Sequence, residues 1–203
     1  MLEQHLLLEL YEQQRLSMQE IAVKLGCSVH KVVYWMDNYG IKRRSISDAV
    51  YLKNNPNGDP FRFSEPQTLE EAVLFGLGIG IYWGEGTKLN SMAVRMGNTD
   101  PALTRTFMDF LIRIFGVARP DFRFAIQIFS DLNPEIAMRF WTSQLRVHRN
   151  QFYKTRSTPS GSLGTYRRKS LHGVCTVHYN NKRLRDLLVG MCRDSSAGRA
   201  RTW

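Results

Sequence analysis

The sequence has few cysteines, no long apolar run and no clustered metal ligands, and each absence excludes a class of protein. Three cysteines are scattered through 203 residues, an odd number that argues for a reducing compartment and against a disulfide framework or a zinc site. The five histidines show no metal-binding spacing. We find no signal-peptide pattern or transmembrane run, and expect a cytoplasmic, nucleoid-associated protein with neither a membrane nor a small molecule as its partner.

Acidic residues are missing from one long stretch of the chain. No Asp or Glu occurs from Ile136 to Arg185, and the whole chain carries a formal net charge of +10. A solvated basic face is the simpler interpretation, but an acid-free stretch of this length favours a phosphate-binding surface. Its basic residues include Arg139, Arg146, Arg149, Lys154, Arg156, Arg167, Arg168, Lys169, Lys182, Arg183 and Arg185.

A glycine-rich apolar run begins after a capping box made of Thr68 and Glu71. Gly76, Gly80 and Gly84 recur every four residues, so they fall in one row along a helix. Each costs about 0.5–1 kcal/mol relative to alanine. The close approach of a second helix backbone is the gain that usually offsets this cost, so we expect a helix–helix seam.

Glu85 stands at the C-terminal end of this helix, just before Gly86. The helix macrodipole disfavours a carboxylate there, and local rules of this kind tend to be broken at functional sites. Two such helices packed side by side would bring two carboxylates together, where they could share divalent metal ions. A salt bridge between Glu85 and Lys88 or Arg95 is the alternative interpretation.

The run Gly80-Ile81-Tyr82-Trp83-Gly84-Glu85-Gly86 resembles the motif that names the LAGLIDADG homing endonucleases. The weaker likeness around it extends from Glu70 to Met191. The resemblance implies that the motif helix forms a dimer seam and that Glu85 binds catalytic Mg²⁺. It implies a homodimer that cleaves double-stranded DNA at specific sequences. Trp83 departs from the family, which often has a smaller or polar residue there, and this affects the expected seam geometry more than the chemistry.

Residues 1–52 have the pattern of a small helical DNA-binding unit. Ser17 and Glu20 form a second capping box, Gly26 marks a turn, and Ser28 caps the following helix. The segment resembles helix-turn-helix domains whose second helix enters the major groove. A helical hairpin that serves only as a packing module is the alternative. The DNA-binding candidates are His30, Lys31, Tyr34, Asn38, Lys42, Arg43 and Arg44.

Residues 53–67 have the composition of a linker, and the pattern beyond residue 68 mixes helices with strands of period two. We expect strands near 92–97, 122–128, 151–157 and 173–179. The predicted fold is therefore α+β, with a helix-turn-helix bundle over 1–52 and a LAGLIDADG-like domain over 68–192 that carries an antiparallel DNA-binding sheet. Residues 193–203 are expected to be a disordered tail.

The alternation of these strands turns polar and basic side chains to one face of the sheet, where they could contact DNA. Lys154, Lys169 and His178 are candidates to polarise the scissile phosphate or position water. The DNA-binding candidates in this region are Arg95, Arg123, Gln127, Arg156, Arg167, Arg168, Thr176 and His178.

Two other functions fit the same features. A regulator that binds DNA without cutting it would keep the fold and lack the chemistry. An RNA-binding or splicing-assisting role would use the same basic surface. A steep salt dependence of binding is expected for each of these nucleic-acid partners.

Overall fold

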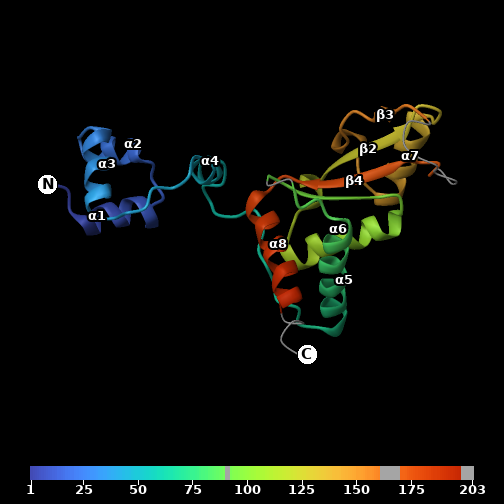
Figure 1. The fold of residues 1–203 in the computed structure, drawn as a ribbon, viewed down its shortest axis with the longest axis horizontal. Coiled ribbons are helices and arrows are strands. Elements are labelled where there is room, and N and C mark those ends of the chain that lie inside the picture. Colours follow the sequence, from blue (N-terminus) through green and yellow to red (C-terminus); the bar gives the residue numbers. More distant parts are fainter. Residues whose placement is uncertain (90–91, 161–169, 198–203) are drawn as a thin grey trace. The chain divides into compact units, whose positions relative to one another are not determined.

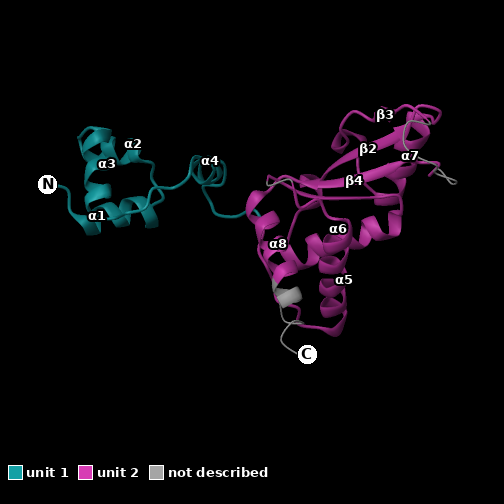
Figure 2. Ribbon diagram, in the orientation of Figure 1, with its two compact units in different colours: residues 1–60 teal, residues 61–203 magenta. Residues whose placement is uncertain are grey.

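The computed structural model describes residues 1–89, 92–160 and 170–197, and the chain divides into two compact units, Met1–Pro60 and Phe61–Trp203 (Figure 2). Each unit buries its own hydrophobic cluster. The first unit is helical and the second combines helices with a sheet, so the protein belongs to the α+β class.

The first unit consists of short helices held by side-chain caps. The capping box of Ser17 and Glu20 is present, with the Ser17 hydroxyl accepting from the Glu20 amide and the Glu20 carboxylate accepting from the Ser17 amide. The Ser28 hydroxyl accepts from the Lys31 amide. The helices are α1 (Gln4–Leu8), continued by the π-helical turn η1 (Glu9–Gln13), then α2 (Met18–Lys24), α3 (Val29–Asn38) and α4 (Ile46–Asn54).

Two glycines in the left-handed region end α2 and α3. Gly26 has φ 59° and Gly40 has φ 66°, and the amides that follow them, those of Cys27 and Ile41, donate back to Ala22 and Met36 at 2.9 Å. This is the Schellman closure that glycine permits. It turns the chain sharply after each helix, so that the apolar faces of α2 and α3 meet over a core of Leu7, Leu10, Tyr11, Ile21, Ala22, Val32, Met36 and Ile41.

The segment expected to be a linker, 53–67, differs from that expectation at both ends. Its first residues continue α4, which buries none of its side chains. Its later part joins the second unit, because the Arg62 amide donates to the Phe115 carbonyl at 2.9 Å and the Ser64 amide donates to the Ile114 carbonyl at 2.8 Å. Phe63 packs between Phe75 and Phe115. Phe61 and Phe63 are apolar residues in this otherwise polar stretch, and they indicate packing against a core that the overall composition does not predict.

The second unit places its helices against one face of a four-stranded sheet in the described residues (Figure 1). The strands are β1 (Val94–Asn98), β2 (Arg123–Phe129), β3 (Arg156–Thr158) and β4 (Val174–Tyr179). The helices are α5 (Leu69–Glu85), α6 (Pro101–Phe115), α7 (Pro134–Leu145) and α8 (Lys182–Ala197), with 3₁₀ turns η2 (Arg119–Asp121) and η3 (Arg149–Gln151).

The sheet is mixed, which corrects the expectation of an antiparallel sheet. The strand order is β1-β4-β2-β3, and β4 pairs antiparallel with both β1 and β2, whereas β3 pairs parallel with β2. The chain leaves β2, passes through α7 and returns as β3, and such a crossover through a helix delivers a parallel strand. The strand expected over 151–157 is shorter and later in the structure: residue 151 ends η3, Phe152 makes a single bridge to Phe124, and β3 begins at Arg156.

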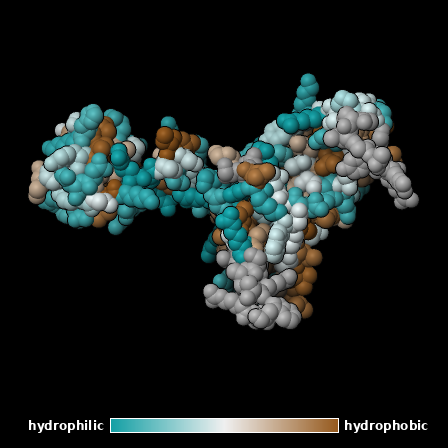
Figure 3. All heavy atoms as spheres, viewed as in Figure 1, coloured by the Kyte–Doolittle hydropathy of each residue, from teal (hydrophilic) through white to brown (hydrophobic). Residues whose placement is uncertain are grey.

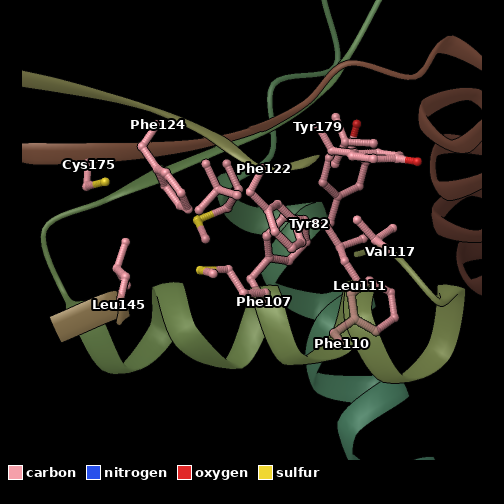
Figure 4. Packing of buried hydrophobic residues seen from close by; sticks show 14 of the residues in the cluster. Tyr82, Phe107, Phe110, Leu111, Val117, Phe122, Phe124, Leu145, Cys175 and Tyr179 are labelled. Atoms are coloured by element: carbon pink, nitrogen blue, oxygen red, sulfur yellow. The ribbon is translucent and has the colours of Figure 1, made fainter. Parts of the chain in front are cut away.

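The core of this unit lies between the sheet and its helices. Figure 4 shows Phe124 and Cys175 directed from β2 and β4 toward the helices, with Phe107 and Phe110 of α6 and Tyr82 of α5 beneath them. Phe107, Phe110 and Phe124 are fully buried. This packing fixes one face of the sheet as the inner face and leaves the other without a helix over it.

Helix α8 runs past the domain boundary expected at residue 192, as far as Ala197. Its start is capped by Asn181, whose side-chain oxygen accepts from the Leu184 amide at 2.9 Å. The last residues of the predicted tail, 198–203, lie outside the described residues.

Candidate nucleic-acid interface

One side of α5 carries apolar residues that nothing in the described chain covers. Leu69 is 82% exposed, Val73 53%, Leu77 51% and Trp83 42%. With Gly76, Gly80 and Gly84 they form one lengthwise surface, which we call the α5 stripe; Figure 3 shows apolar atoms along this helix. A Cβ added at any of these three glycines would meet no atom within 4 Å.

The opposite side of α5 packs inside the unit, and a different glycine makes that contact. A Cβ added at Gly78 would lie 2.1 Å from Cγ of Phe110, so α5 and α6 approach too closely for any side chain there. Tyr82 stacks on Phe107, with ring centroids 6.0 Å apart. The helix therefore has a filled inner face and an outer face shaped for close approach by another backbone.

Glu85 is the last residue of α5 and is exposed to solvent. It forms no ion pair with the described residues, Lys88 and Arg95 included. The next residue, Gly86, bridges to Met96 of β1, and the Thr87 amide donates to the Arg95 carbonyl at 2.9 Å. The α5 stripe thus ends on a carboxylate beside the edge strand of the sheet.

The face of the sheet without helices gathers polar and basic side chains, as the period-two pattern predicts. Register places Arg95 of β1 beside His178 of β4, and His178 beside Arg123 of β2. One row further along the sheet, Thr176 lies between Gly97 and Ala125. Gln127 is paired with Val174 and Arg156, and its side-chain amide donates to the Thr158 hydroxyl at 3.1 Å.

His178 lies at the centre of this open face and is held as a neutral imidazole. Burial, together with the positive charges of Arg95 and Arg156, lowers its pKa from 6.5 to about 4. Its Nε2 is buried without a hydrogen-bond partner among the described residues, and Tyr153 packs edge-on against the ring at 5.5 Å. An unpaired buried nitrogen costs free energy unless a ligand or water reaches it.

The two lysines predicted to assist catalysis have different outcomes. Lys154 is exposed on the segment between η3 and β3. Lys169 lies outside the described residues, as do the DNA-binding candidates Arg167 and Arg168.

In the first unit, the four candidates on α3 share one solvent-facing side. His30, Lys31, Tyr34 and Asn38 are exposed, while Val32 and Met36 on the opposite side are fully buried.

The basic residues after α3 differ in what they contact. Lys42 and Arg43 are exposed, and Nε of Arg43 lies 3.5 Å from the Asp37 carboxylate. The Arg44 guanidinium stacks over the Tyr11 ring at 3.9 Å and donates to the carbonyls of Arg15 and Leu16 at 3.2 Å. Arg44 therefore ties its own unit together, whatever else it contacts.

A basic pocket of about 460 Å³ lies at the start of β2, between η2 and the end of α7. Its lining includes Arg119, Arg123, Arg146, His148 and Gln151. Of these, only Arg123 is predicted as a contact residue from strand alternation. Arg146 belongs to the acid-free stretch, and this stretch was the feature of the sequence that indicated an anion-binding role for it. The lining residues are far apart in the chain, so only the fold brings them together.

The described ranges contain no group of three or more His, Cys, Asp or Glu side chains that could hold a metal ion. Within those same ranges, every helix is too short or too polar to cross a bilayer. No family model matches the chain, and neither the curated proteins nor the solved structures contain a match to it.

Proposed function

We propose that this chain is a sequence-specific DNA endonuclease of the LAGLIDADG homing type, active as a homodimer. The observation that carries the proposal is the α5 stripe, which is apolar, lined with glycine and unpaired, and ends on Glu85 beside the open basic face of the sheet. A surface for a second helix, an acid and a polyanion-binding face thus meet on one unit.

A second copy of the chain is the partner that best suits the α5 stripe. A two-fold contact would place the stripe against itself, and the exposed glycines let two backbones approach closely. The same symmetry would bring the two Glu85 carboxylates together at the end of the seam. A single carboxylate makes only half of a metal site, so the dimer accounts for both the apolar surface and the lone acid.

The open face of the sheet would then bind duplex DNA. Its rows of Arg95, His178 and Arg123, and of Gln127 with Arg156, offer charge for phosphates and amide groups for base edges. Because β1 is the edge strand beside the α5 stripe, pairing two copies would join two such faces into one surface. The exposed side of α3 would read flanking sequence in the major groove as a helix-turn-helix.

The two Glu85 carboxylates would hold Mg²⁺, which when bound activates water and stabilises the leaving 3′ oxygen. Lys154 lies exposed after η3, and in this proposal it assists by placing positive charge near the scissile phosphate.

The proposal is tested by selecting binding sites from a randomised duplex library and assaying cleavage of the selected DNA with Mg²⁺. Wild-type protein should cut both strands, and Glu85→Gln should bind with affinity within about threefold of wild type while cutting at least about 10³-fold more slowly. Glu71→Gln, which changes an acid at the other end of α5, serves as the matched control and should cut normally.

Binding without cleavage by wild-type protein in Mg²⁺ would instead support the non-cutting regulator. Cleavage that survives Glu85→Gln would remove the proposed role of that carboxylate. Sedimentation should find a dimer when DNA is bound, and a monomer in the complex would contradict the proposal as a whole.

A further inference from the structure

The basic pocket beside β2 is built almost entirely from positive and neutral groups. Arg119, Arg123 and Arg146 line it, and no carboxylate does. The acid that comes closest to one of these arginines in the described ion pairs is Asp109, with an oxygen 3.8 Å from Nη2 of Arg119. Three guanidinium groups around one cavity repel one another unless an anion lies between them. The arrangement therefore favours an anionic ligand.

Main-chain contacts hold two of the three guanidinium groups in place. Nη1 of Arg119 donates to the Leu145 carbonyl at 3.2 Å. Nη1 of Arg123 donates to the Pro120 carbonyl at 2.6 Å and the Phe122 carbonyl at 2.9 Å. Each group retains further N–H donors, so it is anchored by one nitrogen while the rest of its fork can donate to oxygen. Such anchoring lowers the entropy lost on binding a ligand.

Arg146 completes the pocket from the end of α7. It ends that helix in the left-handed conformation, with φ 52°, and this turn carries its side chain away from the course of the helix. Its side chain is exposed and takes part in no ion pair with the described residues. Its whole guanidinium group can therefore engage an incoming anion, whereas Arg119 and Arg123 offer the N–H groups that their main-chain contacts leave over.

The lining suits a phosphate better than a whole nucleotide. The volume of about 460 Å³ is many times the roughly 30 Å³ that a water molecule takes up in the liquid, so a phosphate enters easily. The only aromatic ring in the lining is that of His148, and nucleobase sites usually stack the base between flat side chains. Arg119, Arg146 and His148 are all exposed, so the pocket opens to solvent.

The position of Arg123 connects the pocket to the open face of the sheet. Arg123 ends the row that runs from Arg95 through His178, and it also lines the pocket. Neighbouring strands lie about 4.8 Å apart, so the pocket begins roughly 10 Å across the sheet from β1, away from the α5 stripe. A duplex on this face would present its backbone to the pocket on the flank farther from the seam.

We propose that this pocket binds a backbone phosphate of the DNA duplex, gripped by Arg119, Arg123 and Arg146. The inference rests on the proposed function, and it assigns a positioning contact outside the candidate catalytic centre. One such pocket per subunit would fix the duplex at two points placed symmetrically about the seam, which sets its register over the Glu85 pair.

The test compares Arg146→Asn with Arg149→Gln in full-length protein, on a duplex selected with wild type. Asn tolerates a positive φ, so the first variant removes the charge with little strain. Arg149 is the matched control, because it lies nearby in the sequence, loses the same charge, does not line the pocket and is held by two 2.6 Å contacts to Glu135. Equal thermal unfolding midpoints for the two variants establish that both are folded.

Arg146→Asn removes one charge from each subunit of the dimer, so it should weaken DNA binding at least about tenfold and reduce the slope of log affinity against log salt by about 1.8, as expected for two phosphate contacts. Arg149→Gln should stay within about twofold of wild type. Arg146→Lys should keep the slope and lose part of the affinity, since it retains the charge without the fork.

Single methylphosphonate substitutions along the duplex locate the contact. One neutralised phosphate in each half of the site should weaken binding of wild type, and should weaken binding of Arg146→Asn by a smaller factor, because Arg119 and Arg123 still line the pocket. A parallel titration with inorganic phosphate distinguishes the two sources of the ligand: competition with free phosphate but no methylphosphonate-sensitive position would overturn the assignment to DNA.

Arg146→Asn and Arg149→Gln with equal affinities and slopes would overturn this inference alone, because wild type would still bind DNA. A wild-type chain that binds no duplex would overturn the proposed function, and this inference with it.

Discussion

At the scale of single residues, similar side chains perform different tasks according to their neighbours. Lys42 and Arg44 are two residues apart in one basic run, yet Lys42 is exposed while Arg44 stacks on Tyr11 and donates to two carbonyls. Charge alone predicts the same role for both. The surroundings distinguish Lys42, a surface charge, from Arg44, which joins η1 and the turn after it to the end of the basic run.

Arg44→Ala should therefore destabilise the first unit by about 1–2 kcal/mol, through loss of the cation–π contact and of hydrogen bonds from a charged donor. Lys42→Ala removes the same charge and should change the free energy of unfolding by less than about 0.5 kcal/mol. Urea unfolding of residues 1–60 measures both. Equal effects of the two substitutions would contradict the structural role of Arg44.

His178 gives the protein a pH-dependent term in its stability. Its folded pKa, near 4, lies below the ordinary value of 6.5, so the unfolded chain takes up the proton first as pH falls. The free energy of unfolding should therefore decrease as the pH falls from about 6.5 to about 4. Below about pH 4 this residue should cause no further decrease. Urea unfolding across this window should show a shallower decrease for His178→Gln than for wild type. Parallel curves for the two proteins would contradict the assignment.

At the scale of elements, α5 is the helix on which the candidate function depends. Glycines occur on both of its faces, and the physical reason for glycine differs between the two faces. Gly78 meets Phe110 inside the unit, whereas Gly76, Gly80 and Gly84 face open space in the single chain. A monomer gains nothing from the three outer glycines, which lower its helix propensity. The cost is offset only if something approaches that face closely.

Gly78→Ala and Gly80→Ala should consequently have opposite effects on the free energy of unfolding of the monomer. The first should lower it by about 1–3 kcal/mol through overpacking against Phe110. The second should raise it by about 0.5–1 kcal/mol through helix propensity, because its Cβ meets nothing. Chemical unfolding at a protein concentration below the dissociation constant of the dimer measures both changes.

Gly80→Ala should at the same time weaken self-association, which sedimentation at higher concentration detects. Stronger or unchanged dimerisation of this variant would contradict the role of the α5 stripe as a seam.

At the scale of the whole molecule, the two units bury separate cores, and the boundary between them follows packing more closely than composition. Phe61 and Phe63 belong to the second unit although they stand in a polar, proline-containing stretch. The first unit should fold alone as residues 1–60, and the second as residues 61–203.

A fragment of residues 61–203 should be more stable than one of residues 68–203 by about 2–3 kcal/mol. The shorter fragment lacks two backbone hydrogen bonds to the end of α6 and the aromatic contacts of Phe63. Thermal and urea unfolding of the two fragments provide the comparison, and equal stabilities would place the boundary at residue 68 after all.

The sequence by itself determined the features that depend on short-range periodicity and caps. The capping boxes, the glycine row of α5 and the strand alternation that turns Arg95, Thr176 and His178 to one face all follow from residues a few positions apart. The structure contains the Ser17–Glu20 capping box, the glycine row and the strand alternation. The expected box at Thr68 is half formed: the Thr68 hydroxyl accepts from the Glu71 amide, but the Glu71 carboxylate accepts from the amide of Gln67 and not from that of Thr68. The proposal that the α5 stripe pairs with a second copy and that Glu85 holds a metal stays a prediction.

The tertiary structure decided what depends on residues far apart in the chain. The parallel direction of β3 follows from the crossover through α7. The docking of Phe63 depends on the rings of Phe75 in α5 and Phe115 in α6, which the fold brings close to it. The basic pocket joins Arg119, Arg123 and Arg146 from three segments. Local pattern fixes which face of an element is apolar, but which faces meet is set by the packing of the whole core, and no short stretch of sequence contains that information.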